Sequence, residues 1–229
     1  MVETISIDFA RPAPLFPLPN CVLLPHASIP LHIFEQRYRD MVHDALDSAG
    51  LIAMAMFQGD QWKSDYQGKP ALRPHVCVGY IIKHEQLDDG RYNILLQGVC
   101  RARILREVEG RTYRTAILRP TEKRSTMEID LSQHRQRLTE LLNDPLLQQL
   151  SSVSALQNCL SEELPTAVLM DLAGMTVCDR MDDRYRLLAE ADPFSRADWL
   201  AHLLGELRQT LSLAGKFEAR RTSEGHCLN

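Results

Sequence analysis

The first half of the chain consists of short apolar runs separated by turn residues, a pattern typical of β-strands. The earliest run contains four prolines, so it predicts short or kinked edge strands, because proline has no N–H to donate to a strand ladder. Gly50 precedes another run, and Asp89-Gly90 and Gly110 each separate two runs as hairpin turns do. The predicted strands are residues 14–25, 51–57, 75–84, 91–99, 101–108 and 113–120.

A helix is predicted to begin near Ile33, inside the stretch SIPLHIFEQRYRDMVHDAL at residues 28–46. Apolar side chains spaced by three and four positions predict one buried face, and Glu35 is placed to pair with Arg39 one turn later. Pro30 keeps the preceding residues extended. The predicted buried face consists of Phe34, Tyr38, Met41, Val42, Ala45, Leu46 and Ala49.

From Leu131 onward the apolar spacing becomes helical and predicts a helical bundle. Pro165 stands near the start of one predicted helix, where proline is tolerated. Ser195 and Asp198 have the spacing of a capping box at the start of another helix, residues 195–211. The apolar stripe of that helix is Trp199, Leu200, Leu203, Leu204, Leu207 and Leu211.

These patterns predict an α+β protein with two parts. Residues 1–124 are expected to form a strand-rich domain with one helix, of the small barrel or sandwich type. Residues 125–214 are expected to form the helical bundle, which a polar link at 121–130 joins to the sheet. Residues 215–229 are expected to be a flexible tail.

Composition and charge place the chain among ordinary globular proteins. It has 229 residues, of which 45% are hydrophobic and 24% charged, and its net charge is −4. It contains no apolar stretch long enough to cross a membrane, and it begins with no signal-peptide pattern. Its six cysteines include no C-x-x-C pair, so they predict neither a zinc site nor a disulfide framework. The expected location is the cytoplasm.

Residues 101–124 are the basic part of the chain, with eight Lys and Arg against three Asp and Glu. Arg101 and Arg103 alternate with apolar residues, as on the solvated face of a strand. Binding of single-stranded nucleic acid is typically supported by aromatic side chains among the cations, and here they are sparse. We therefore interpret the stretch as an exposed strand face, and nucleic acid is not expected as a partner.

Three side chains are candidates for catalysis. His32 and Glu35 have the spacing of a base and its orienting partner, but a zinc helix of the H-E-x-x-H type needs a second histidine that is missing here. Cys77 lies two positions after His75, and we interpret it as a core thiol rather than a nucleophile. The sequence predicts no metal site and no cofactor.

Signatures of ATP hydrolysis and of serine-lysine proteolysis are also missing. Neither Gly-Lys pair of the chain is followed by the Ser or Thr that a phosphate loop requires. Lys63 and Lys123 lie near serines, but in polar segments that do not promise the burial a catalytic lysine needs. We expect no enzyme activity.

The polar segment 58–74 carries Trp62 and Tyr66 with few apolar neighbours. Long loops that contain aromatic residues often bind ligands or partners. Two interpretations stay open: the rings form a peptide-binding surface, or they fold back on the sheet. Trp62 and Tyr66 are therefore the candidate peptide-binding residues.

Two blocks of the chain, residues 15–46 and 78–104, carry a recognisable signature, which resembles that of the Lon protease N-terminal, or substrate-binding, domain family. The resemblance extends through the helical half and covers about residues 14–211. This sequence departs from the family pattern at His26, where glycine is usual, and at Gln36, where proline is frequent. We interpret the matching positions as structural; they are Phe16, Pro17, Leu18, Val22, Leu23, Leu24, Pro25, Pro30, Leu31, Ile33, Phe34, Glu35, Arg37, Tyr38, Met41, Gly79, Glu85, Gly90, Gly98 and Arg103.

The resemblance implies a twisted β pseudo-barrel with one helix, followed by a helical bundle, which is the layout predicted above. It also implies a non-catalytic, stand-alone module that recognises polypeptide segments, in apolar grooves or along an exposed strand edge. Expected partners are unfolded or specific protein clients and a separate protease or ATPase, with no membrane involved.

An alternative function is that of a small hydrolase or ligand-binding protein that uses the cleft between the β and helical halves. Its site would contain His32, Glu35 or Cys77. Strongly perturbed pKa values in such a cleft would favour this alternative.

Overall fold

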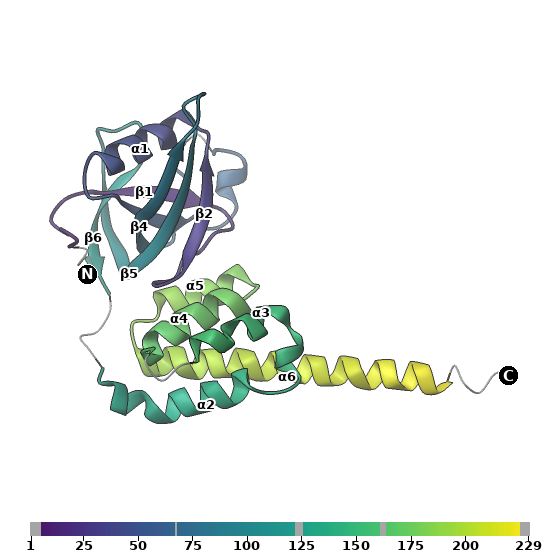
Figure 1. Ribbon diagram of the computed structural model, residues 1–229. Helices are drawn as coiled ribbons and strands as arrows, with labels where there is room; N and C mark the ends of the chain where they lie inside the picture. The colour runs from purple at the N-terminus through teal and green to yellow at the C-terminus, as the bar shows by residue number, and fades with distance from the viewer. Residues whose placement is uncertain (1–5, 67, 122–125, 161–163, 225–229) are drawn as a thin grey trace. The chain divides into compact units, whose positions relative to one another are not determined.

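The structure is a computed structural model that describes residues 6–66, 68–121, 126–160 and 164–224 (Figure 1). The chain divides into two compact units. The β unit comprises residues 1–124 and 180–191, and the helical unit comprises residues 125–179 and 192–229.

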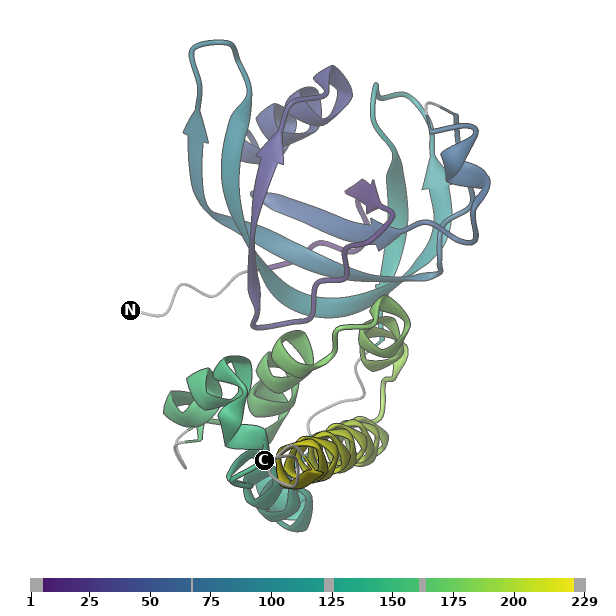
Figure 2. The same ribbon diagram turned by 90° about the vertical axis from the view of Figure 1, so that its right-hand side faces the viewer.

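The β unit is built on one six-stranded sheet in the order β2-β5-β4-β3-β1-β6. Because β5 also pairs with β6, the strands curl into a ring (Figure 2). Only β1 and β3 run parallel among these pairs, and the α+β class predicted from the sequence is confirmed. The strands are β1 (Ala13–Leu18), β2 (Ser28–Ile33), β3 (Leu51–Met56), β4 (His75–Gln86), β5 (Tyr92–Val108) and β6 (Thr115–Pro120). One cluster of buried side chains in the β unit consists of Leu15, Ala53, Ala55, Val76, Val78, Ala102, Ala116 and Leu118.

β5 is one strand of 17 residues, where the sequence predicted two. Its first part pairs with β2 and β4 and its last part with β4 and β6, and register shifts allow the bend between them. The alternation of Arg101 and Arg103 with apolar residues predicted that both lie on a solvated strand face. Arg101, however, is only 1% exposed, and its Nε donates a hydrogen bond to Leu187 O at 3.3 Å. The prediction of an exposed Arg101 is therefore wrong, whereas Arg103 is exposed.

The first helix, α1 (Gln36–Leu46), begins three residues later than predicted. The preceding residues 28–33 form β2, and Glu35 is the N-cap of the helix. Phe34 therefore lies outside the helix and is 61% exposed, so its prediction as a core residue is wrong. The rest of the predicted face is confirmed for Tyr38, Met41, Val42 and Ala45, while Leu46 is half-buried and Ala49 exposed.

The loop before β2 packs tightly on β5 at Gly98. Gly98 N donates to Ala27 O and His26 N donates to Gly98 O, each at 2.8 Å. His26 has a φ of 65°, in the left-handed region that favours glycine. This is the position where the resembled family usually has glycine, so the departure falls on a strained residue.

Replacing His26 by Gly is expected to stabilise the β unit by about 0.5–1 kcal/mol, because glycine adopts this backbone conformation without a clash at Cβ. The His26 side chain is exposed, so little packing is lost. Calorimetry should record a higher melting temperature for His26→Gly, with His26→Asn between it and the wild type. A lower melting temperature for His26→Gly would mean that the imidazole makes a stabilising contact.

Helix α5 (Met181–Ala189) packs on β4 of the β unit. His75 N donates to Tyr185 Oη at 2.9 Å, and the Arg73 guanidinium lies 4.5 Å from the centre of the Tyr185 ring. Arg73 also pairs with Asp182 at 2.5 Å. These contacts explain why residues 180–191 belong to the β unit, although the sequence placed them with the bundle.

The helical unit is organised around α6 (Pro193–Glu224), which contacts α2 and α4 (Figure 1). Ser195 N and Oγ donate to Asp192 Oδ2 at 3.1 and 2.9 Å, so Asp192 caps α6 and the predicted Ser195–Asp198 box is wrong. α6 stays helical to Glu224, through most of the predicted tail 215–229, and residues 225–229 lie outside the described part. The other elements are α2 (Ser132–Leu142), α3 (Ser151–Ser154), α4 (Thr166–Val177) and short 3-10 helices at Glu128–Leu131, Leu147–Gln149 and Ala155–Cys159.

The bundle core is apolar, and four of the six residues of the stripe predicted for α6 belong to it: Leu200 and Leu204 are buried in the core, and Leu207 and Leu211 pack against it. Among the described residues, no helix combines the length and the apolar character that crossing a membrane requires.

Candidate functional site

Three aromatic side chains, which we call the aromatic cluster, lie together where β3 leads into the 58–74 loop. Phe57 is buried, and Trp62 stacks on it with ring centres 5.9 Å apart. Tyr66 meets Phe57 edge to face at 6.0 Å. Trp62 and Tyr66 thus fold back on Phe57, and both stay half-buried. Of the two interpretations left open by the sequence, the folded-back arrangement is found, and it still leaves part of each ring accessible.

Residues at the start of α1 brace this cluster. The Arg37 guanidinium lies between two rings, 4.6 Å from the centre of Tyr38 and 4.9 Å from that of Tyr66. Glu35 pairs with Arg37 at 3.0 Å and accepts a hydrogen bond from Tyr66 Oη, also at 3.0 Å. The predicted pair of Glu35 with Arg39 is therefore replaced by contacts with Arg37 and Tyr66.

A cavity of about 500 Å³ lies beside this cluster, and we call it the hairpin cavity. Its lining carries four cationic side chains and two carboxylates. Arg114 is fixed by Glu107 and by Pro70 O, and Lys69 pairs with Glu109 at 2.6 Å. The lining residues are Arg37, Tyr38, Gly68, Lys69 and residues 107–114, which span the β5–β6 turn.

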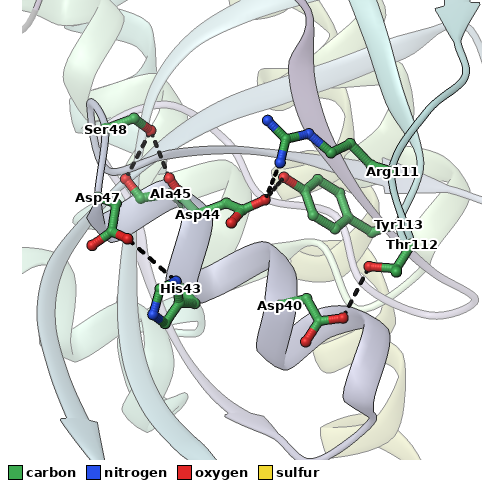
Figure 3. A network of polar contacts seen from close by, with 9 residues as sticks. All are labelled: Asp40, His43, Asp44, Ala45, Asp47, Ser48, Arg111, Thr112 and Tyr113. Carbon is green, nitrogen blue, oxygen red and sulfur yellow. Dashed lines mark hydrogen bonds and ion pairs between the residues drawn. The ribbon is translucent and has the colours of Figure 1, made fainter.

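The tip of the β5–β6 hairpin is tied to α1 by polar contacts (Figure 3). Asp44 accepts hydrogen bonds from Arg111 Nη1 at 2.8 Å and from Tyr113 Oη at 2.7 Å. Asp40 accepts one from Thr112 Oγ1 at 3.0 Å. Burial, and next the hydrogen bond to Asp44, raises the pKa of Tyr113 to about 12. The hairpin is therefore held in place with the Tyr113 hydroxyl protonated.

Two donor atoms in the wall of the hairpin cavity are buried without a well-formed hydrogen bond. Tyr38 Oη lies beside the Tyr66 hydroxyl but makes no hydrogen bond of good geometry. Arg37 Nη2 is 3.0 Å from Glu35 Oε2 but is not aligned with it for a hydrogen bond. Burial raises the pKa of Tyr38 well above its usual value, so its hydroxyl stays a donor.

The structure does not bring the three catalytic candidates together. His32 is exposed on β2 and hydrogen-bonds Asn93 at 2.8 Å, and Asn93 is level with Glu85 on β4. Cys77 lies eight positions from Glu85 on that strand, roughly 25 Å away at about 3.3 Å per residue. Cys77 is fully buried, and Glu35 braces the aromatic cluster instead of His32.

The lysine candidates give no catalytic site among the described residues. Lys63 is 60% exposed and pairs with Asp60, so it lacks the desolvation that a catalytic lysine needs. Lys123 and Ser125 lie outside the described part. Within that part, no group of three or more His, Cys, Asp or Glu side chains is arranged to hold a metal ion.

The other signature positions outside α1 lie in β1, in the connection between β1 and β2, in β2 and in the β4–β5 hairpin. Gly79 is opposite Gly98, and a Cβ on either would press against Leu96 or Leu24. Pro17 and Pro25 are buried, Leu18 and Leu31 are half-buried, and Pro30 is exposed.

Sequence reasoning missed Phe57 and the residues of the hairpin cavity. Phe57 ends the apolar run of β3 and gave no signal beyond ordinary core packing. The β5–β6 turn carries charged residues at every second position from Glu107 to Arg111, and these were the one local signal of ion pairs there. Nothing local indicated that this turn meets α1, because the contact joins residues about seventy positions apart.

Comparison with known proteins places this arrangement in context. Residues 12–206 match the family model described as the ATP-dependent protease La (LON) substrate-binding domain. The chain is 25% identical over 220 residues to the Lon protease of Geobacter metallireducens and 21% identical over 215 residues to that of Desulfosudis oleivorans. These alignments cover 92% and 90% of this chain but 26% and 25% of those proteases, so the chain spans about a quarter of their length.

Solved structures agree at the level of the fold. The Lon N-terminal domain protein from Xanthomonas campestris superposes with a TM-score of 0.59 at 23% identity, covering 83% of this chain and 96% of that one. The N-terminal domain of the Mycobacterium avium complex Lon protease gives a TM-score of 0.60 at 15% identity, covering 85% and 98%.

Proposed function

The chain belongs to the ATP-dependent protease La (LON) substrate-binding domain family, and from that premise we propose that it is a non-catalytic module that recognises polypeptide segments. The aromatic cluster is its contact surface. Unfolding and cleavage of a bound polypeptide are then the work of an ATPase and a protease outside the residues described here.

The observation that carries the proposal is the bracing of two half-exposed rings. Trp62 and Tyr66 rest on buried Phe57, and Glu35 and Arg37 hold Tyr66 from the other side. Rigid aromatic side chains lose little conformational entropy on binding and contribute large apolar contacts, which is why they dominate many recognition surfaces. Glu35 and Arg37 are family-signature positions, so the bracing links the signature to the loop.

Addition of a peptide strand to the edge of β2 is supported less well. β2 pairs with β5, and Pro30 is level with Leu95. Proline has no N–H, so Pro30 occupies a position whose backbone groups point away from β5. The backbone groups of Ser28 and His32, two positions before and after Pro30, point the same way. The middle of the outer edge thus lacks a donor, which weakens it as a template for another strand.

Nucleic acid is not part of the proposal. Arg101 is buried and Arg114 is bound to Glu107, so two cations of the basic stretch are engaged inside the β unit. The alternative hydrolase has no support from the positions of His32 and Cys77, which lie far apart on the sheet.

Replacing Trp62 and Tyr66 together by Ser is expected to weaken binding of fluorescently labelled β-casein, an unfolded polypeptide, by roughly tenfold, because two ring contacts are lost. Fluorescence anisotropy measures the Kd. The melting temperature is expected to fall as well, because Tyr66 gives up its hydrogen bond to Glu35 and both rings cover Phe57, so circular dichroism must show that the variant is folded at the temperature of the binding assay.

The matched control is Trp199→Ser in α6, which removes the other tryptophan of the chain from the helical unit and should leave the Kd unchanged. With ATP added, the wild type should release no phosphate and leave casein intact. Unchanged casein binding by the double variant would place the contact surface elsewhere, and casein fragments would show that the module is catalytic.

A further inference from the structure

The hairpin cavity and the aromatic cluster share a wall. Arg37 and Tyr38 line the cavity, and the same Arg37 guanidinium stacks on Tyr66 of the cluster. A polypeptide that rests on Trp62 and Tyr66 therefore has the cavity next to it, and a group that projects from the polypeptide can enter the cavity.

Two residues that line the cavity have a buried donor whose hydrogen bonding is incomplete. Tyr38 Oη and Arg37 Nη2 are both buried without a well-formed hydrogen bond. A buried donor with a poorly aligned partner is under-satisfied, so a ligand that supplies well-placed acceptor oxygens improves its hydrogen bonding as well as forming new bonds. Both atoms are screened from solvent, so an acceptor reaches them only after a flanking side chain moves.

The rim of the cavity carries two exposed cations, of which Lys69 is free to move. Lys69 is 65% exposed and its pair with Glu109 lies in solvent, where such a pair is worth little. Arg111 is also mostly exposed, but its Nη1 is engaged by Asp44. Glu107 is held by the Nε and Nη2 donors of Arg114. A second anion can thus attract Lys69 while Glu109 turns into solvent.

We propose that the hairpin cavity receives a carboxylate of the bound polypeptide, supplied either by its C-terminus or by an acidic side chain. This inference rests on the proposed function and adds the chemistry of the recognised group. A cation would meet four positive side chains, and a neutral amide would give the rim cations no charge partner. A phosphate dianion would lie against Glu107 and Glu109, so the single charge of a carboxylate fits best.

The test uses three acetylated peptides that carry a carboxylate at the C-terminus, nowhere, or on a side chain. The first is acetyl-Leu-Phe-Leu-Ala with a free C-terminus, the second is its carboxamide, and the third is the carboxamide with Glu in place of Ala. Amide NMR of the isotope-labelled full chain gives the Kd of each peptide. The free acid is expected to bind roughly tenfold more tightly than the carboxamide, with shifts at Gly68, Gly110 and Thr112.

Two lysines of the same loop provide a matched pair of variants. Lys63 and Lys69 are 60% and 65% exposed, and each pairs with a carboxylate, but only Lys69 lines the cavity. Lys69→Gln is expected to reduce the preference for the free acid by roughly threefold, and Lys63→Gln to leave that ratio unchanged. Equal effects of both variants would mean that only general electrostatic attraction is at work, which overturns the inference.

Tyr38→Phe separates binding from folding. It removes only a hydroxyl whose polar neighbour, the Tyr66 hydroxyl, forms no well-aligned hydrogen bond with it, so the melting temperature should change little while most of the preference for the carboxylate disappears. Tyr185→Phe is the opposite control, because it removes an acceptor of His75 N and should lower the melting temperature without changing the preference. A Tyr38→Phe variant that loses stability and keeps the preference would assign the hydroxyl to folding and overturn the inference.

The third peptide identifies the source of the carboxylate. Binding as tight as that of the free acid assigns the cavity to any carboxylate, and binding as weak as that of the carboxamide assigns it to a C-terminus; both results support the inference. Equal binding of all three peptides overturns it and leaves the proposed function intact. If neither the peptides nor β-casein binds, the proposed function falls with it.

Discussion

Replacing Gly98 by Ala is expected to destabilise the β unit by roughly 3 kcal/mol or more, because the added methyl group has no room in a packed core. A Cβ on Gly98 would lie 2.2 Å from Leu24 O and 3.0 Å from Cys77 Sγ. The Leu24 carbonyl belongs to the backbone, so it cannot move aside as the end of a flexible side chain can.

The loop that carries this carbonyl is also anchored to the glycine itself. Gly98 exchanges hydrogen bonds with Ala27 O and His26 N, both at 2.8 Å, so moving the loop away from Ala would break both. Denaturant unfolding followed by far-UV circular dichroism measures the loss as a lower midpoint. A cooperative transition with an unchanged midpoint would show that the loop yields more easily than this geometry implies.

Two other glycines serve as controls. At Gly79 the nearest atom to an added Cβ is Leu96 Cγ at 2.7 Å, which belongs to a side chain, so Gly79→Ala should cost less than Gly98→Ala. At Gly205, within α6, nothing lies within 4 Å of an added Cβ. Gly205→Ala should therefore stabilise the helical unit, by about 1 kcal/mol from helix propensity alone.

Features encoded in neighbouring residues could be predicted from the sequence. The Asp89-Gly90 turn and the buried side chains of α1 from Tyr38 to Ala45 depend on a few adjacent positions, and both are found. The spacing of apolar residues also predicted the α+β layout, and the family signature agreed with it. In each case the pattern and its physical cause lie within a single turn, strand or helix.

The errors come from contacts between distant residues. Arg101 looks like a surface residue until α5 supplies Leu187 O as its acceptor. Phe34 fits the apolar face of a helix only if the helix begins before β2 ends, and the pairing of β2 with β5 decides that. The cap of α6 is an exception, because the contact between Asp192 and Ser195 is local: the prediction took Ser195 as the start of the helix, whereas α6 begins at Pro193.

The candidate site likewise combines features that the local sequence predicts with features that depend on distant contacts. Trp62 and Tyr66 stood out as rings in a polar loop, which is a local signal. Their support on Phe57 and Arg37, and the cavity beside them, depend on α1, β3 and the β5–β6 turn meeting in space. Contacts between segments this far apart in the chain leave no local pattern in the sequence.

Glu35→Ala is expected to cost roughly 2–3 kcal/mol, whereas Phe34→Ala should cost less than about 1 kcal/mol, which reverses the order expected from the sequence. Phe34 is 61% exposed, so truncating it removes little buried area. Glu35 is mostly buried and is the carboxylate partner of Arg37 as well as the acceptor of Tyr66 Oη. Without it, the largely buried guanidinium of Arg37 loses its charge partner and Tyr66 loses its hydrogen bond.

Thermal unfolding of the two variants side by side measures this difference. Glu35→Gln is the informative control, since the amide keeps an oxygen for Tyr66 and removes only the charge next to Arg37. The melting temperature of Glu35→Gln should fall between those of the wild type and Glu35→Ala. The difference in stability between the two Glu35 variants then reports the hydrogen bond to Tyr66. If Phe34→Ala proves the more damaging change, the ring of Phe34 packs against the protein in solution and the sequence-based placement in the core was right.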